Sequence, residues 1–179
     1  MDGASDPTAW LEDGPCPVSS HNEWDPLEEV IVGRVEGAAI PGVHVSIRQV
    51  LPRRLDRMLP WIGGWHYPRR FVEAARRELD EFIHILEAEG AIVRRPEPVD
   101  FRRKFRTPHW SSRGFACACP RDGFLVIGNE IIETPMSWPS RHFEGIAYRP
   151  LFKEYFARGA RWTAAPRPEL RDELYDANF

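Results

Sequence analysis

The sequence PRDGFLVIGNEII, residues 120–132, carries the strongest signal for the fold. Two apolar, β-branched runs lie on either side of Gly128 and Asn129, and both of these residues accept a positive φ. The pattern predicts two antiparallel strands joined by a tight turn within residues 124–132. A similar apolar run in LEEVIVG, residues 27–33, predicts a further strand that is buried on both faces.

A repeated unit surrounds these strands: a helix, then Gly-Ala, a short strand and Pro-x-Pro. The first helix is expected at residues 71–89, where apolar side chains recur at helical spacing. The second is expected at residues 143–158, with a break at Pro150, because proline costs about 3 kcal/mol inside a helix. The short strands that follow are expected at residues 91–93 and 160–163. This alternation of strands and helices predicts an α/β fold.

The repeat also suggests how the chain is organised. It predicts two module-like units at about residues 18–100 and 115–168. Residues 1–17 are expected to form a flexible leader, and the proline- and glycine-rich residues 35–68 an irregular loop. The first residues are acidic and lack an apolar stretch, which argues against a secretory or mitochondrial targeting signal.

Length and composition exclude several classes of protein. The chain has 179 residues, enough for one domain, with a formal net charge of −3 and a pI of about 6.1. Nucleic-acid-binding domains typically have a pI above ~9, and a membrane-spanning helix needs ~20 consecutive apolar residues, which are absent. Three cysteines are too few for a disulfide framework. We therefore expect a cytoplasmic protein with no nucleic-acid and no membrane partner.

Few residues have the spacing that catalysis or metal binding requires. The six histidines include no i,i+4 pair, so no metal site is predicted. Cys117 and Cys119 are separated by one residue, unlike the C-x-x-C of zinc and redox sites, and are expected to be buried structural thiols. The basic stretch at residues 94–106 is expected to be a solvated loop, with a phosphate or nucleic-acid patch as the alternative.

Asp122 is the residue of greatest chemical interest, and two interpretations apply to it. A carboxylate at the end of a strand can form paired, charge-assisted hydrogen bonds with a planar guanidinium. The sequence Pro-Arg-Asp-Gly is also typical of a turn, in which the carboxylate would only cap its own backbone. From the residue types alone the turn is favoured, and Arg121 is expected to point away from Asp122 and to serve structure.

Three long segments resemble the glycine amidinotransferase family. They are HNEWDPLEEVIVGR (residues 21–34), PRDGFLVIGNEIIETPMSW (120–138) and YRPLFKEYFARGARWTAAPRPELRDELYD (148–176). That family includes arginine:glycine amidinotransferases and inosamine-phosphate amidinotransferases. The resemblance implies a partial five-bladed α/β propeller, pentein-like, in which residues 18–179 are the N-terminal portion of an amidinotransferase domain and form about two ββαβ modules.

The resemblance also implies a reaction. In this family a cysteine thiolate takes the amidino group from arginine, ornithine leaves, and an amine such as glycine accepts the group, with no metal and no organic cofactor. The family's nucleophile matches no cysteine of this chain, whereas its contact to the arginine guanidinium matches Asp122. We therefore expect Asp122 to be a substrate-binding residue, no catalytic residue within the chain, and arginine and an amine acceptor as small-molecule partners.

Two expectations follow for the chain by itself. Without the thiolate it should transfer no amidino group from arginine, and its uncovered strand edges should lead to self-association or to pairing with missing C-terminal modules. The alternative is a catalytically inert fragment that acts only by association with other chains. A weaker third interpretation is a binding module built on the basic loop.

Overall fold

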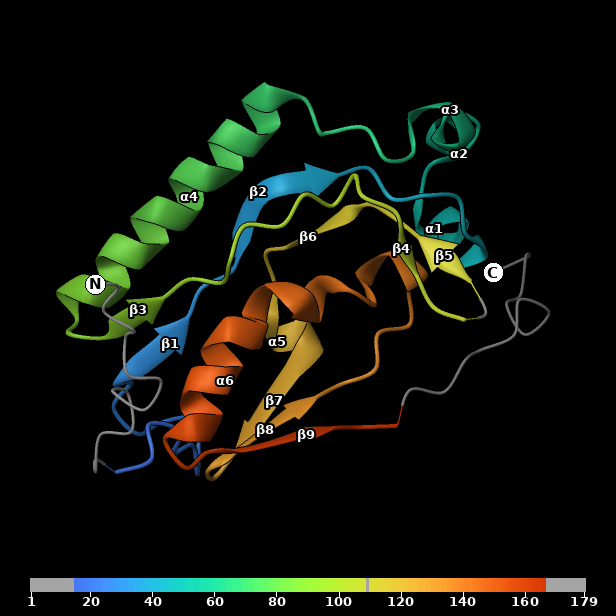
Figure 1. Ribbon diagram of the computed structural model, residues 1–179. Coiled ribbons are helices and arrows are strands. Elements are labelled where there is room, and N and C mark those ends of the chain that lie inside the picture. The colour runs from blue at the N-terminus through green and yellow to red at the C-terminus, as the bar shows by residue number, and fades with distance from the viewer. Residues whose placement is uncertain (1–14, 109, 167–179) are drawn as a thin grey trace, which may run out of the picture.

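The computed structural model describes residues 15–108 and 110–166 (Figure 1). The hairpin expected from the sequence is formed by β7 (Phe124–Ile127) and β8 (Glu130–Glu133), which pair antiparallel. Gly128 has a φ of 58° in the connecting turn, which explains the glycine at this position. The hairpin prediction is therefore confirmed, although β7 is an edge strand whose side chains are mostly exposed.

The second copy of the repeat completes this sheet. Helix α6 (Arg149–Ala157) follows the hairpin, and β9 (Arg161–Ala164) then pairs parallel with β8. Figure 1 shows α6 lying alongside the β7–β8–β9 sheet. The expected helix is broken: a 3₁₀ segment, η2 (Glu144–Tyr148), precedes α6, and Pro150 occupies the first turn of α6. Proline is tolerated there because a first-turn N–H has no helical partner, so the predicted break is confirmed.

The first copy of the repeat is smaller. Strand β1 (Glu29–Ile31) pairs parallel with β3 (Ile92–Arg94). The long helix α4 (Arg69–Ala88) directly precedes β3 in the sequence. The helix and both strands occur where the sequence predicts them. The expected burial of residues 27–33 on both faces is wrong, since β1 pairs with one strand and its side chains are half-buried.

The expected irregular loop at residues 35–68 is also wrong. It contains most of strand β2 and three short helices, whose bounds are β2 (Arg34–Ala39), α1 (Val45–Val50), α2 (Arg53–Asp56) and α3 (Leu59–Ile62). The prolines and glycines delimit these elements instead of preventing them: Pro52 precedes α2 and Gly63 ends α3. β2 pairs antiparallel with β6 (Phe115–Cys117), far away in the sequence.

Three of the remaining elements lie between the two copies, namely β4 (Phe105–Arg106), β5 (Ser111–Ser112) and α5 (Pro120–Gly123). The 3₁₀ segment η1 (Pro139–Arg141) lies within the second copy, between β8 and η2. Within residues 15–108 and 110–166, no helix combines the length and apolar character needed to cross a membrane. Residues 1–14 of the expected leader and Pro168 of the second Pro-x-Pro lie outside the described residues.

The core lies where η2 and α6 pack against β6 and the hairpin. Tyr148 and Phe152 are each 1% exposed, and the ring of Phe124 contacts both, with centroid distances of 4.8 and 4.6 Å. The Tyr148 hydroxyl donates to the Cys117 carbonyl oxygen at 2.5 Å, which joins η2 to β6. This packing fixes the segment from β6 to η2, on which the candidate site is built.

An ion pair joins the two copies of the repeat. Arg94 of β3 donates two hydrogen bonds to the carboxylate of Glu154 in α6, at 2.9 and 2.6 Å. The Tyr155 hydroxyl also donates to the Glu29 carboxylate of β1. The Arg94 and Arg95 side chains are 26% and 18% exposed. The solvated loop expected at residues 94–106 is therefore wrong at its start, where these arginines hold elements together.

Candidate functional site

Asp122 lies in α5, the single helical turn that connects β6 to β7. Its backbone is tied on both sides: its N–H donates to the Cys119 carbonyl at 3.3 Å, and its carbonyl accepts from the Thr134 hydroxyl at 3.0 Å. The carboxylate has a different partner, the guanidinium of Arg141, with 2.9 Å between Oδ2 and Nη1. Among the described residues, the carboxylate accepts no hydrogen bond from its own turn.

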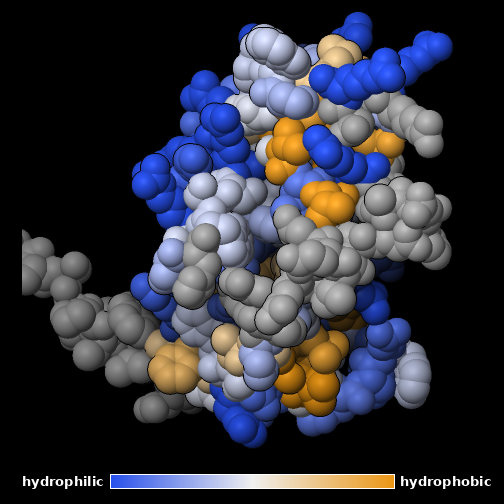
Figure 2. Space-filling model, turned by 90° about the vertical axis from the view of Figure 1, so that its right-hand side faces the viewer, coloured by the Kyte–Doolittle hydropathy of each residue, from blue (hydrophilic) through white to orange (hydrophobic). Residues whose placement is uncertain are grey.

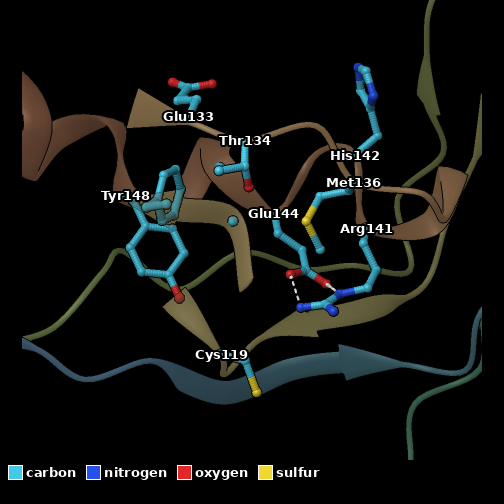
Figure 3. Close-up of a pocket in the computed structure, with 11 residues that line it drawn as sticks. Cys119, Glu133, Thr134, Met136, Arg141, His142, Glu144 and Tyr148 are labelled. Atoms are coloured by element: carbon cyan, nitrogen blue, oxygen red, sulfur yellow. Dashed lines mark hydrogen bonds and ion pairs between the residues drawn. The ribbon is translucent and has the colours of Figure 1, made fainter. Parts of the chain in front are cut away.

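Arg141 is held more firmly than Asp122. Its Nε and Nη2 atoms donate to the two carboxylate oxygens of Glu144 at 2.9 and 3.0 Å, the planar two-bond arrangement that arginine forms best. Figure 3 shows this pair side by side, joined by two dashed lines. The exposed fractions are 14% for the Arg141 side chain, 8% for Glu144 and 51% for Asp122. The Arg141–Glu144 pair thus forms the buried end of the cluster, and Asp122 forms its exposed end.

Burial and charge act in opposite directions on this pair. Burial raises the pKa of Glu144 to about 7, although hydrogen bonds from Arg141 lower it. Burial lowers the pKa of Arg141, but the carboxylates of Glu144 and Asp122 raise it by more than burial lowers it. The net shift of the Arg141 pKa is therefore upward. When both acids are ionised the three side chains carry a net charge of −1, which favours a cation at the exposed end.

Phe115 supports Arg141 from another side. Its ring centroid lies 5.0 Å from the Arg141 guanidinium carbon. The Trp138 ring contacts the Phe115 ring edge-on, with 5.6 Å between the two ring centroids. Phe115 has a φ of 78°, which is unusual for a non-glycine residue. The preceding Gly114 also has a positive φ, and a Cβ there would meet the backbone of Ile40 at 2.4 Å. The close approach of two backbone segments at Gly114 therefore accompanies the unusual conformation of Phe115.

A small pocket adjoins the cluster (Figure 3). It is lined by Cys119, Gly123, Phe124, Glu133, Thr134, Met136, Arg141, His142, Glu144, Gly145 and Tyr148. Asp122 does not line it, but both Arg141 and Glu144 do. Glu133 is 3% exposed and accepts from the Trp162 ring N–H at 3.0 Å, which connects the pocket wall to β9.

The two neighbouring cysteines differ from the expectation. Cys117 is fully buried, as expected, but Cys119 is exposed because β6 ends at Cys117 and the chain turns into α5. Burial raises the pKa of Cys117 to about 11, and partial burial together with the nearby Asp122 carboxylate raises that of Cys119. Both thiols are therefore protonated at neutral pH, the opposite of what an activated nucleophile requires.

Arg121 does not join the cluster. Its guanidinium pairs with the Glu23 carboxylate at 2.8 Å, and both side chains are about four-fifths exposed. The two adjacent residues Arg121 and Asp122 thus have separate partners. Within residues 15–108 and 110–166, no group of three or more His, Cys, Asp or Glu residues could hold a metal ion.

Three members of the cluster were not predicted from the sequence, namely Arg141, Glu144 and Phe115. The i,i+3 spacing of Arg141 and Glu144, just after Pro139, is a signal that could have indicated an ion pair. No pattern in the sequence predicts that this pair meets Asp122, nor that Phe115 adopts a positive φ. The substrate-binding role of Asp122 stays a prediction.

Comparisons with known proteins identify relatives with a shared activity. No family model matches the chain. Glycine amidinotransferase, mitochondrial, of Danio rerio is 52% identical over 164 residues, which are 92% of this chain and 39% of the relative. L-arginine:L-lysine amidinotransferase of Pseudomonas savastanoi pv. phaseolicola is 49% identical over 89% of this chain and 44% of that protein.

A solved structure gives the same result. An amidinotransferase from Microseira wollei in the saxitoxin biosynthetic pathway superposes with a TM-score of 0.78 and 56% identity. The match covers 92% of this chain and 46% of that chain. The chain thus spans less than half the length of the relatives that it matches.

Proposed function

Because the chain is a member of the glycine amidinotransferase family over the 164 residues that it shares with the Danio rerio relative, we propose that it takes part in amidino transfer from arginine to an amine. The observation that carries the proposal is the Asp122 carboxylate, half-exposed at the end of a buried ion pair and already bonded to a guanidinium. We also propose that the chain forms about two ββαβ modules of a five-bladed, pentein-like propeller. The β7–β8–α6–β9 unit supports this proposal for the second module.

The proposed role of Asp122 is to bind the guanidinium of arginine. A thiolate attacks the guanidinium carbon, the C–N bond to the ornithine nitrogen breaks, and that nitrogen leaves with a proton as ornithine. An acceptor amine then attacks the amidino-cysteine carbon, loses a proton and releases the thiolate. In this scheme Asp122 keeps the guanidinium charged and oriented, so that its carbon faces the nucleophile.

The described cysteines do not fit the role of nucleophile. The pKa of Cys117 and that of Cys119 are both raised, and the Cys16 thiol donates to the Val18 carbonyl oxygen at 3.4 Å. We propose that the thiolate comes from outside the described residues, and that the chain contributes the guanidinium-binding carboxylate. No metal or organic cofactor enters this scheme.

Arginine binding by the purified chain tests the role of Asp122. Asp122→Asn should weaken L-arginine binding at least tenfold by calorimetry, because a charge-assisted hydrogen bond contributes about 1.5–3 kcal/mol. Asp100→Asn is the matched control, since Asp100 also pairs with an arginine, Arg102, and is similarly exposed. If Asp122→Asn lowers stability while arginine binding stays normal, Asp122 is a turn residue and the guanidinium role is wrong.

A second proposal is association, either with further modules or with other copies of the chain. The edge strand β7 exposes Leu125 and Ile127 by 49% and 58%, and Trp61 of α3 is 80% exposed. Figure 2 shows hydrophobic side chains gathered among hydrophilic ones on the face that carries the short helices. Sedimentation velocity should show concentration-dependent assemblies, and an inert fragment acting by association would show them without arginine binding. A monomer at every concentration would exclude self-association.

A further inference from the structure

We propose that Arg141 is a positioning residue that orients the Asp122 carboxylate for a planar guanidinium ligand. This inference rests on the proposed function, because it assumes that Asp122 binds arginine. It assigns to Arg141 a role in selecting the ligand, in addition to its structural contacts.

The hydrogen bonds of Arg141 are divided in a way that suits this role. Nε and Nη2 are both directed to Glu144, so the guanidinium plane is set by a partner that is 8% exposed. The remaining contact, Nη1 to Oδ2 of Asp122, then restricts the rotation of a carboxylate that is half-exposed. Among the described residues no donor contacts Oδ1 of Asp122, so this oxygen is available to a ligand.

The aromatic support of Arg141 is the second observation. Phe115 lies against the guanidinium and is itself backed by Trp138. The positive φ of Phe115 is a strained conformation that persists where the surrounding structure requires it. Residues of this kind cluster at binding and catalytic sites, where the strain holds a side chain in place. Here the side chain that is held in place is that of Arg141.

A comparison with the adjacent arginine shows that Arg141 is unusual. Arg121 and Glu23 are 84% and 79% exposed, so their pair orders two long, mobile side chains and fixes little. Arg141 is 14% exposed and is already ordered by Glu144 and Phe115 before it meets Asp122. Its hydrogen bond can therefore restrict the orientation of the Asp122 carboxylate.

Ligand selectivity is the property that such positioning changes. A carboxylate held in a fixed plane can receive two N–H groups of a guanidinium, whereas an ammonium gains little from that orientation. A freely rotating carboxylate would bind both cations through charge alone. Arg141 should therefore raise the preference for L-arginine over L-lysine, which has the same charge and the same α-amino acid group.

The test compares the dissociation constants of L-arginine and L-lysine, measured by calorimetry on the full chain. The wild-type chain should prefer arginine at least tenfold. Arg141→Met should reduce this preference to less than threefold, and Arg141→Lys should do the same, because an ammonium cannot contact Glu144 and Asp122 in one plane. Arg121→Met is the matched control and should keep the wild-type preference.

The outcomes separate this inference from the proposed function. If Asp122→Asn abolishes arginine binding while both Arg141 variants keep the tenfold preference, the inference is wrong and the proposed function stands. If Asp122→Asn leaves arginine binding unchanged, both are wrong. If the wild-type chain shows no preference for arginine while Asp122→Asn still weakens arginine binding tenfold, only the inference is wrong. Circular dichroism monitors folding, and if Arg141→Met does not fold, Arg141→Lys and Glu144→Gln decide, with the same loss of preference expected.

Discussion

The carboxyl group of Glu144 makes the stability of the chain depend on pH in a direction that can be measured. The Glu144 side chain is 8% exposed, and burial raises its pKa from 4.5 to about 7 despite the opposing charge of Arg141. The folded chain therefore holds this proton more tightly than the unfolded chain does. Its stabilising effect is fully present below pH 4.5 and is lost as the pH rises through about 7.

The size of this effect follows from the displacement of the pKa. Each tenfold change in proton affinity corresponds to about 1.4 kcal/mol, so a change from 4.5 to about 7 corresponds to about 3 kcal/mol. Urea unfolding of the wild-type chain and of Glu144→Gln between pH 5 and 8 measures it. The wild-type free energy of unfolding should fall relative to that of Glu144→Gln by most of this amount as the pH rises.

Glu154→Gln is the matched control for this experiment. A hydrogen bond from Arg94 lowers the pKa of Glu154, so its contribution is present above the unfolded pKa and is lost as the pH falls through the folded one. Across pH 5 to 8 the difference between wild type and Glu154→Gln should stay constant. If the difference between wild type and Glu144→Gln is also constant in that range, the raised pKa of Glu144 is wrong. The Arg141–Glu144 pair would then not be the buried support of Asp122 that is described above.

Three further predictions concern the core, the link between the repeats and the thiols. Phe152→Ala should lower the free energy of unfolding by about 3–5 kcal/mol in urea, because its ring is buried among aromatic rings, and a loss below 1 kcal/mol would refute that packing. Arg94→Met should lower the free energy of unfolding by about 1 kcal/mol, since the Arg94–Glu154 pair is partly exposed. Arg102→Met on the exposed loop should leave the free energy of unfolding unchanged, and equal losses in the two variants would contradict this difference. With iodoacetamide at pH 7.5, mass spectrometry should find Cys119 alkylated before Cys117, with both rates rising at higher pH; earlier labelling of Cys117 would contradict its burial.

Sequence patterns predicted the elements whose causes are local. The turn at Gly128 and the helix break at Pro150 depend on the backbone preferences of those residues, so they are visible in the sequence. The strand β2 was missed because it is stabilised by pairing with β6, some eighty residues later, and its own sequence contains Gly37. The exposure of Cys119 was missed for a related reason, since the position at which β6 ends depends on that pairing.

The candidate site was predictable to the extent of one residue. Asp122 stands out because Pro-Arg-Asp-Gly is a distinct motif before a hairpin. Its partner Arg141 comes nineteen residues later and reaches it only because η1 packs against β6 and β5. Tertiary packing also creates the burial that shifts the pKa of Glu144, so no local pattern could have indicated it.

Release of ornithine from L-arginine by the purified chain tests most directly the claim that it supplies a guanidinium-binding carboxylate and not the thiolate. We expect no release above background in the presence of glycine, with Cys117→Ala and Cys119→Ala indistinguishable from wild type. Clear turnover by the wild-type chain, abolished by either cysteine substitution, would identify that cysteine as the nucleophile and contradict the account.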